Sequence, residues 1–442
     1  MGKRPTREEI LHWDRRHVWR PFCSIEEQEQ DDPWVIVDAE GSWLYDADGR
    51  RYLDAHGGWW VNNLGHRHPR LQAALRQQLE GLIHCSMADT THEAAAYLAK
   101  ELVEATPQGL DRVFFSDDGS TAVEVALKIA YQYWQQNGRP SRRRFISLAG
   151  AYHGDTLGAM SVGGIQEFRQ TFGPMLFEVL RPSPGYAEAE WKQATAHIET
   201  CLRERPEEIA GVIVEPLIQG VAGMRFWSPE LLRRLRQATQ AADTFLIADE
   251  IFTGLGRSGR MWACEHAEVS PDLLCSAKWL SGGTLPFAVT LASERIYDGF
   301  RGGRERALLH GHSYCGNPLG ASVAREVLRI YREEALLERA RSLEAKLGAG
   351  VRHIAERYGA LRPRAWGAVA ALDLGPPGYL SEHSQRIRDV ARHHGLCLRP
   401  LGSVLYVAPP LTLSESECEF LLQGLEATVA ELGPLPGVPS SN

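Results

Sequence analysis

The feature that most constrains the fold of this chain is a repeated alternation of apolar runs with amphipathic segments between about residues 66 and 329. Charged residues do not interrupt the runs, and the segments between them have helical spacing. Strands that are apolar on both faces and alternate with helices form a mostly parallel sheet covered on both sides. The strands we expect are Arg112–Ser116, Arg144–Leu148, Gly211–Glu215, Phe245–Asp249, Leu273–Ser276 and Phe287–Ala292, with helices such as Thr121–Trp134 and Pro229–Ala241 between them.

The pattern differs on either side of this α/β region. Residues 33–54 alternate apolar residues with turns, which is typical of short hairpins. The C-terminal part mixes a long charged helix with strands and a second helix, as an α+β domain does. Its expected elements are Tyr331–Tyr358, Ala368–Leu374, Ser384–His394 and Val404–Val407. We therefore expect an N-terminal segment (1–65) that packs with the small domain, a large domain (66–329) and a small C-terminal domain (330–442).

Composition excludes several classes of protein. The 442 residues are too many for one small core, and the net charge of -8 argues against a nucleic-acid surface. Eight cysteines occur without a CxxC pair, and the N-terminus lacks a signal peptide's apolar region, so we expect reduced thiols in a cytoplasmic protein. No apolar run has the length of a membrane span. The histidines at 66, 68, 310 and 312 lack further ligands at metal spacing, so no metal is expected.

Two charged residues follow expected strands. Asp249 ends Phe245–Asp249, and Lys278 follows Leu273–Ser276 just before a glycine-rich turn. Ligands of an open parallel sheet bind beyond the carboxyl ends of its strands. A lysine walled by Trp279 would be poorly solvated, which lowers the pKa of its amine and makes it nucleophilic. Taken singly, Asp249 is better explained as a carboxylate that caps the following turn, and Lys278 as a surface lysine, which is the usual position of this residue type.

Two further strand ends carry groups that suit a flat, phosphorylated ligand. Gly119 and Ser120 lie where the first free N–H groups of a helix would point, and phosphate is the ligand that such a helix start usually binds. Tyr152 follows Arg144–Leu148 beside glycines and could stack on a ring. Alone, the first feature also fits an ordinary helix cap, and the second a tyrosine that covers a loop. Together, a phosphate cradle, a stacking aromatic, a carboxylate and a desolvated lysine match what pyridoxal phosphate requires.

A dinucleotide-binding alternative is not supported. Residues 254–259 fit the GxGxxG pattern. That fingerprint requires the turn to open a helix inside a βαβ unit. The residues that follow, 260–265, are a poor helix start, so we do not expect a Rossmann site here.

The whole chain resembles a known family. Ala248-Asp249-Glu250-Ile251, Gly256-Arg257-Ser258-Gly259 and Lys278 with Ser281-Gly282-Gly283 are similar to the class III (ornithine/ω-amino) aminotransferases of fold type I. Trp59-Trp60, Gly119-Ser120, the run Tyr152 to Thr156, Asn317-Pro318 and Arg399-Pro400 are similar to the members of the biotin pathway within that family. The resemblance implies a large domain with a mostly parallel seven-stranded sheet and a smaller α+β domain. It also implies a homodimer with shared active sites.

The resemblance also implies a role for each matching residue. Lys278 would form the Schiff base with pyridoxal 5'-phosphate and move the proton, Asp249 would pair with the ring nitrogen, and Tyr152 would stack on the ring. Gly119 and Ser120 would hold the phosphate, with His312 and Ser313 contributed at the cofactor of the neighbouring subunit. The residues expected to line the substrate cavity are Phe22, Trp59, Trp60, Tyr152, Asp155, Gly311, Arg399 and Tyr406. Arg399 would bind the carboxylate of the acceptor.

The amino donor is left open by the residues. The resemblance implies transfer to 8-amino-7-oxononanoate, with S-adenosylmethionine or lysine as donor. Phe22, Gly57-Gly58, His312 and Leu401 depart from members that use adenosylmethionine, and several such departures are similar to relatives that use lysine. Tyr406 instead resembles the adenosylmethionine type. Two rivals remain: another class III ω-amine transaminase, and a non-catalytic protein or small-molecule sensor built on the same fold.

Overall fold

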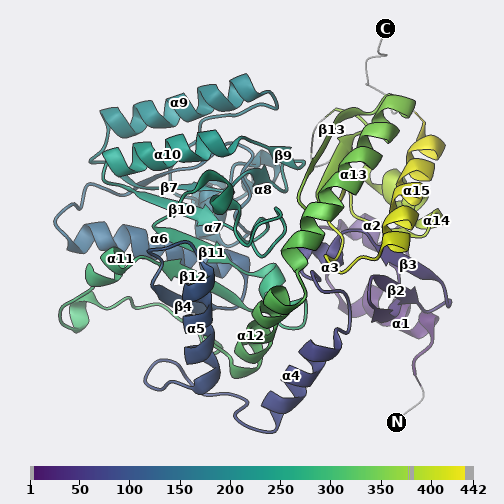
Figure 1. Ribbon diagram of the computed structural model, residues 1–442, viewed down its shortest axis with the longest axis horizontal. Coiled ribbons are helices and arrows are strands. Elements are labelled where there is room, and N and C mark those ends of the chain that lie inside the picture. The colour runs from purple at the N-terminus through teal and green to yellow at the C-terminus, as the bar shows by residue number, and fades with distance from the viewer. Residues whose placement is uncertain (1–3, 377, 379–382, 434–442) are drawn as a thin grey trace.

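The computed structural model describes residues 4–376, 378 and 383–433. Two bodies of secondary structure lie side by side, and the helices α12 (Pro318–Glu333) and α13 (Leu336–Tyr358) run from one into the other (Figure 1). Among the described residues, no helix is both long and apolar enough to cross a membrane.

The larger body is built on a seven-stranded sheet, as expected. Its strand order is β4-β12-β11-β10-β7-β5-β6. Only β12 runs antiparallel to its two neighbours, and the other pairs are parallel. In that order the strands are Arg112–Ser116, Ala288–Ala292, Leu273–Ser276, Phe245–Asp249, Ile209–Val214, Arg144–Ile146 and Val179–Leu180. The carboxyl ends of the parallel strands therefore lie along one edge of the sheet.

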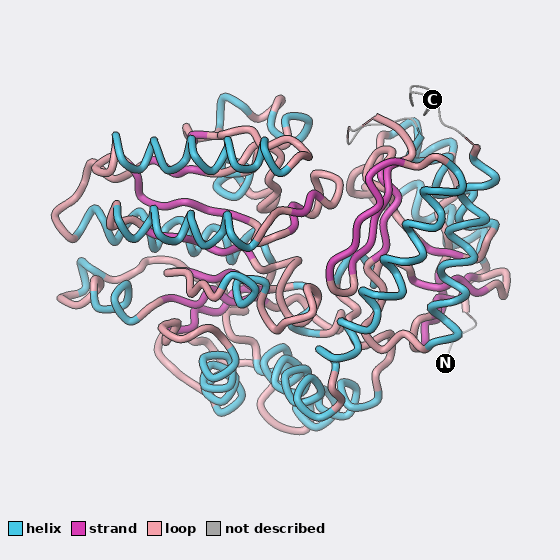
Figure 2. Tube along the Cα trace, turned by 45° about the horizontal axis from the view of Figure 1, so that its top comes forward, coloured by secondary structure: helices cyan, strands magenta, loops and turns pink. Residues whose placement is uncertain are grey.

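Helices cover both faces of this sheet, which explains why its strands are apolar throughout (Figure 2). Along β10, Phe245 and Ile247 pack in the cluster that contains the apolar face of α6 (Gly119–Gln136). The alternate residues Leu246 and Ala248 pack in the cluster of α9 and α10. The last two helices span Glu188–Glu204 and Pro229–Ala241.

The smaller body contains the N-terminal strands and the C-terminal part of the chain. Strand β3 pairs in parallel with β15, where Leu53 is opposite Leu396, so the N-terminal segment does pack with the C-terminal domain. The strands are β1 (Ile36–Glu40), β2 (Trp43–Asp46), β3 (Arg51–Asp54) and β15 (Leu396–Cys397) in one sheet, and β13 (Leu361–Trp366), β14 (Val369–Asp373) and β16 (Val404–Val407) in another. The domain limits 1–65, 66–329 and 330–442 stay a prediction, and residues 434–442 lie outside the described part.

The remaining elements are short strands and helices around these sheets. They are α1 (Arg7–His17), α2 (Ile25–Gln30), α3 (Gly57–Trp60), α4 (Pro69–Leu79), α5 (Glu93–Ala105), α7 (Leu157–Val162), α8 (Gln166–Arg169), α11 (Glu294–Asp298), α14 (His383–His393), α15 (Glu415–Leu432), β8 (Ile218–Gln219) and β9 (Arg225–Phe226).

The structure corrects one expected helix and adds a strand. The charged helix expected at Tyr331–Tyr358 is two helices, because Ala335 takes a left-handed conformation with φ of 49°. Tyr331 belongs to α12, and α13 begins at Leu336. Strand β6 was not expected, since two residues are too few to produce a periodic pattern. The segment 254–259 forms turns and leads to a short 3-10 helix at Ala263–Ala267, so it does not open an α-helix, as expected.

Candidate active site

Three ionisable groups meet where neighbouring strands end. Asp249 is the last residue of β10 and lies opposite Cys275 of β11, three residues before Lys278. On the other side Ala248 lies opposite Val214 of β7, and Glu215 follows directly. Strand register therefore places Glu215 and Lys278 on either side of Asp249.

Asp249 is a buried carboxylate with a fixed orientation. It is 4% exposed, its Oδ2 is 2.7 Å from Nδ1 of His153, and its Oδ1 accepts the N–H of Ile251 at 3.1 Å. His153 is itself buried, and its Nε2 has no hydrogen-bond partner among the described residues. Because an ionised carboxylate only accepts, Nδ1 of His153 donates to it. The contact with His153 thus fixes the orientation of Asp249.

Lys278 lies in surroundings that favour a neutral amine. Burial lowers the pKa of Lys278 below its ordinary value, and the charges of Asp249 and Glu215 counter only part of this effect. Its Nζ lies 4.8 Å from the ring centroid of Trp60. The backbone of Lys278 is left-handed, with φ of 40°, a conformation that is costly for a residue with a side chain. A neutral primary amine in a confined site is a nucleophile.

Glu215 was not expected at the site and has a perturbed pKa. Burial raises the pKa of Glu215 to about 7, although His153 and two hydrogen bonds to its carboxylate act in the opposite direction. The carboxylate accepts the backbone N–H of Tyr152 at 3.0 Å and that of Gly220 at 2.9 Å. Glu215 therefore ties the segment that carries Tyr152 to the end of β7. Its place at the end of an expected strand was the available signal, the same signal that identified Asp249.

The start of α6 has the shape of an anion site. Asp118 caps the helix by accepting the N–H of Thr121 at 2.9 Å. A Cβ on Gly119 would lie 2.9 Å from Cγ2 of Ile251, so a larger residue would force Ile251 to move. The Oγ of Ser120 accepts the N–H of Asp155 at 3.2 Å. Free N–H groups and a small residue at a helix start fit a phosphate, as the sequence suggested.

Tyr152 is oriented from several sides. Its hydroxyl donates to Oδ2 of Asp155 at 2.8 Å, and its ring meets that of Phe168 edge to face with centroids 5.7 Å apart. Phe168, on α8, also lies 6.0 Å from the ring of Phe22. The sequence pointed to Tyr152 and Asp155 but not to Phe168, because a lone aromatic in a short helix has no distinguishing pattern.

An aromatic and cationic wall brings together distant parts of the chain. The guanidinium of Arg399 lies 4.5 Å from the ring centroid of Trp59 and 5.9 Å from that of Phe22. Phe22 and Trp59 meet edge to face at 5.5 Å. Trp60 points to the other side, 6.0 Å from the ring of Tyr406. The side chains expected from sequence therefore form two neighbouring groups. One group contains Arg399, Trp59 and Phe22. The other contains Trp60 and Tyr406.

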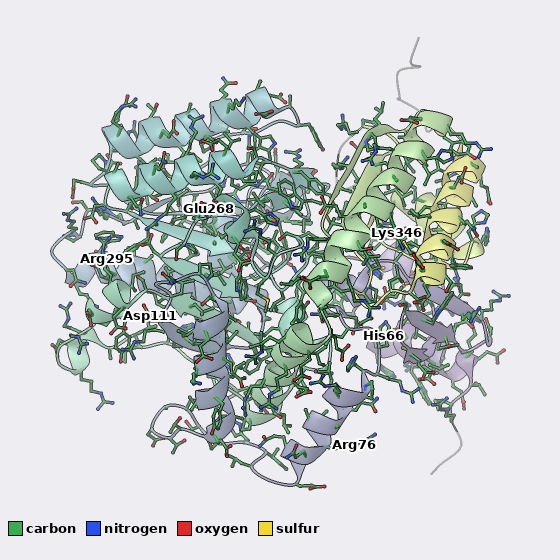
Figure 3. All side chains as sticks on the ribbon, viewed as in Figure 1. His66, Arg76, Asp111, Glu268, Arg295 and Lys346 are labelled. Carbon is green, nitrogen blue, oxygen red and sulfur yellow. The ribbon has the colours of Figure 1, made fainter. Side chains whose placement is uncertain are left out.

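The tryptophan pair lies on an unusual backbone. Gly57, Gly58, Trp59 and Trp60 all have φ between 58° and 72°. Oδ2 of Asp54 accepts the N–H of Gly58 at 2.6 Å, and its carboxylate is bonded to His56 and His66, each at 2.8 Å. His66, labelled in Figure 3, lies on the half of the molecule that holds the N-terminal strands.

The segment 311–313, expected to complete a partner's cofactor site, lies at the start of α6 in its own chain. Nε2 of His312 is 3.5 Å from Oδ1 of Asp117. Gly311 and Ser313 are exposed, so both could contact a second subunit. Their role in cofactor or substrate binding stays a prediction.

Comparison with protein families gives one description for almost all of the chain. Residues 25–429 match the family described as Aminotransferase class-III. Proteins named adenosylmethionine-8-amino-7-oxononanoate aminotransferase from Geobacter sulfurreducens and Synechococcus elongatus are 38% and 43% identical over 439 and 425 residues. These alignments cover 95% and 94% of this chain, and 97% and 98% of the relatives.

Solved structures agree over a similar extent. The crystal structure of a protein of the same name from Methanocaldococcus jannaschii matches with a TM-score of 0.92 at 33% identity, covering 96% of this chain and 98% of that one. An amine transaminase from an uncultivated Pseudomonas species, solved in its PLP-bound form, matches with a TM-score of 0.88 at 34% identity. That match covers 94% of this chain and 98% of the other.

Proposed function

The chain belongs to the class III aminotransferases, and from this premise we propose that it transfers an amino group from S-adenosylmethionine to 8-amino-7-oxononanoate. The product would be 7,8-diaminononanoate, an intermediate of biotin biosynthesis. The main support is that relatives 37–43% identical over more than nine-tenths of this chain carry the corresponding name. The walls around Trp59 and Trp60 suit a long apolar acceptor that ends in a carboxylate.

The enzyme is a pyridoxal-phosphate-dependent transaminase, and the residues present fit that cofactor. The start of α6 at Gly119 and Ser120 offers backbone N–H groups to a phosphate, Lys278 has a pKa lowered by burial, and Asp249 offers a fixed buried carboxylate. When bound, the cofactor supplies an aldehyde that accepts an amino group and a ring that accepts an electron pair. We propose that Gly119 and Ser120 hold its phosphate and that Tyr152 covers its ring.

The protein's own groups would manage protons and charge. Asp249, held in place by its contact with His153, would pair with the ring nitrogen and favour a proton there. Lys278 would take and return the proton on the substrate carbon, since a neutral amine can act as a base at neutral pH. The indole of Trp60 covers the amine and would keep water away from it.

Arg399 is the proposed partner of the acceptor carboxylate. It lies against Trp59 and Phe22, so its planar group is already oriented, and its fork can bond both carboxylate oxygens. A charge-assisted pair of this kind is worth roughly 1.5–3 kcal/mol. Arg399→Ala should therefore raise the acceptor KM about tenfold to a hundredfold. The cofactor should remain bound, and an unchanged acceptor KM would remove this role.

The donor assignment rests on Tyr406, which lies beside Trp60 and is fully buried. The decisive experiment separates the two half-reactions. Purified protein saturated with pyridoxal phosphate is mixed with S-adenosylmethionine or with lysine, and the absorbance of the bound cofactor is followed. We expect faster change with S-adenosylmethionine. A faster reaction with lysine would assign lysine as the donor and keep the acceptor.

A generic ω-amine transaminase is the second candidate, favoured by the likeness to the amine transaminase from Pseudomonas. The same assay with a simple aryl amine as donor and 8-amino-7-oxononanoate or pyruvate as acceptor distinguishes the two. Turnover with the aryl amine and pyruvate, together with none on the oxononanoate, would reject the proposed function.

We propose that the working unit is a cytoplasmic homodimer. Five large apolar side chains near Ser313 and the end of α4 are 44–80% exposed: Leu79, Leu82, Ile83, Leu309 and Tyr314. The rings of His84 and Tyr314 are 5.5 Å apart, so the two segments adjoin. Exposed apolar groups that gather in this way are typical of protein contacts. All eight cysteines are free, which suits a reducing compartment.

A further inference from the structure

A separate cavity lies between the large domain and the sheet of β13, β14 and β16. Its volume is about 250 Å³. Its walls include Gly150, Ile165, Val221, Arg225, Leu401 and Val404. None of the residues assigned above to the cofactor or the substrates lines it.

The cavity contains a cation that lacks a counter-charge. Arg225 and Arg362 both stack on Tyr186, at 4.4 Å and 4.3 Å from its ring centroid. Arg362 is paired with the buried Asp373. Among the described residues, by contrast, no carboxylate lies within ion-pair distance of Arg225, and its buried Nε has no hydrogen-bond partner. The acidic residue lining the cavity, Glu167, is exposed and does not reach it.

Neighbouring polar atoms are also left unsatisfied. The buried hydroxyl of Tyr186 and the buried Oε1 of Gln219 have no hydrogen-bond partner within the described chain. A Cβ on Gly150 would lie 3.2 Å from NH1 of Arg225 and 3.4 Å from Oε1 of Gln219, so both groups converge beside this glycine. Buried polar groups without partners cost stability, and a ligand that bonds them recovers it.

Three segments connect this cavity to the active site. Gly150 lies two residues before Tyr152, and Leu401 lies two residues after Arg399. Val404 lies on the same face of β16 as Tyr406, since side chains alternate along a strand. The segments that line the cavity therefore continue into those that carry Tyr152, Arg399 and Tyr406.

The two proposed substrates need two cations. In 8-amino-7-oxononanoate the carboxylate is separated from the reacting carbon by a chain of methylenes, whereas an α-amino-acid donor carries its carboxylate on the reacting carbon itself. Because the reacting carbon must take the same position in both half-reactions, the two carboxylates cannot bind at one place. Arg399 can serve only one of them.

We propose that Arg225 is a second carboxylate-binding residue, and that the cavity around it receives the anionic end of one of the two substrates. The inference rests on the proposed function for the identity of those substrates. Tyr186 holds the guanidinium flat, and Gln219 offers an acceptor to a polar group of the same ligand.

The test compares three variants in the separate half-reactions. Arg225→Gln should raise the KM for one substrate about tenfold to a hundredfold and leave the kcat and the other substrate's KM within twofold. Arg225→Lys should restore part of the affinity, because it keeps the charge and loses the fork. Arg362→Gln, which removes the other arginine that stacks on Tyr186, is the matched control and should change neither KM. The affected half-reaction tells whether the donor or the acceptor enters the cavity.

A second variant and a direct binding measurement distinguish loss of the binding site from misfolding of the variant. Val221→Phe narrows the cavity and keeps Arg225, and it should raise the same KM. Calorimetry on the holoenzyme should show that nonanoate binds more tightly than nonanamide. Loss of part of that difference in Arg225→Gln would assign the acceptor to the cavity and leave Arg399 to the donor, whereas loss only in Arg399→Ala would assign the donor to the cavity. Unchanged KM values for both substrates in Arg225→Gln and Val221→Phe would overturn the proposal. If the wild type does not use the oxononanoate at all, the proposed function fails, while nonanoate binding still tests the pocket.

Discussion

At the scale of single residues, the reactive properties of the site come from desolvation balanced by a few charges. The pKa of Lys278 is lowered because the amine is buried. The buried carboxylate of Asp249 is held by a hydrogen bond with His153. Glu215 lies close enough to both charges to affect them, and its own pKa rises to about 7. The pKa of Lys278 and that of Glu215 therefore differ from those of exposed residues of the same types, and burial is the main cause in both.

Lys278→Ala should abolish transamination while the fold and phosphate binding persist. The variant loses its nucleophile and base but keeps Gly119, Ser120 and Tyr152. Borohydride reduction of the wild-type holoenzyme followed by peptide mapping should label Lys278. Label on another lysine, or wild-type turnover by the variant, would show that the assignment is wrong.

Asp249→Asn should retain the cofactor and lose activity by orders of magnitude. A neutral amide cannot keep the ring nitrogen protonated, so the ring accepts electrons poorly. The measurement is kcat/KM together with the cofactor content of the purified variant. Activity close to that of the wild type, with the cofactor bound, would contradict the proposed role of this carboxylate.

At the scale of elements, the loop that carries the two tryptophans depends on one buried carboxylate. Successive residues in the left-handed conformation are unfavourable, and Trp59 and Trp60 lack the conformational freedom of glycine. Asp54 compensates by accepting the N–H of Gly58 and bonding His56 and His66. A sheet residue at the end of β3 thus sets the position of Trp59 and Trp60.

Asp54→Asn should lower the free energy of unfolding by about 3 kcal/mol at pH 7, as removal of one partner from a buried ion pair does. Burial alone would raise the pKa of Asp54, but its hydrogen bonds with His56 and His66 outweigh this and hold that pKa well below its ordinary value. A depressed carboxyl pKa stabilises the folded state above the unfolded pKa of about 4, and this contribution is lost as the pH falls further.

Thermal melts of wild type and Asp54→Asn between pH 7 and pH 3 test this. The difference in melting temperature should stay constant down to about pH 5 and shrink below about pH 4. A difference that grows on acidification would have the wrong sign for this carboxylate.

At the scale of the whole molecule, the site lies where the two bodies meet. Lys278, Asp249 and the start of α6 come from the large sheet, whereas Arg399 and Tyr406 come from the C-terminal part and Phe22 from the N-terminal segment. Arg257 also joins the two bodies, because its buried guanidinium donates to the carbonyls of Ala368 and Pro409. Relative movement of the two bodies would therefore change the substrate cavity and the cavity at Arg225 together.

The dimer proposal makes a quantitative prediction about association. Sedimentation of the wild type at micromolar concentration should give twice the chain mass, and Tyr314→Glu should shift it toward monomer and weaken cofactor binding. Ser313→Ala is the matched control: it should remain dimeric and lose about fivefold in cofactor affinity, the value of one hydrogen bond of about 1 kcal/mol. A wild-type monomer with full cofactor occupancy would refute the shared site.

Local sequence patterns determined the elements and the residues at their ends. Uninterrupted apolar runs predicted six of the strands in the large sheet, because strands covered on both faces require them. The position of Asp249 and Lys278 at or just after the ends of such runs predicted that both lie at one edge of the sheet, and their roles there stay a prediction. Two features could not be predicted in this way. Strand β6 is too short to show a period, and the break at Ala335 lies within an otherwise continuous helical pattern.

Only the tertiary structure decided which distant side chains touch. His153 and Asp249 are 96 positions apart, and Arg399 meets Phe22 across nearly the whole chain, so no local spacing could pair them. The same is true of Arg225 and Tyr186, whose side chains stack although they are distant in sequence. Periodicity reports how one segment is buried, whereas a contact, a missing partner or a shifted pKa depends on every element packed around it. That is why the fold class followed from the chain alone and the chemistry of its cavities did not.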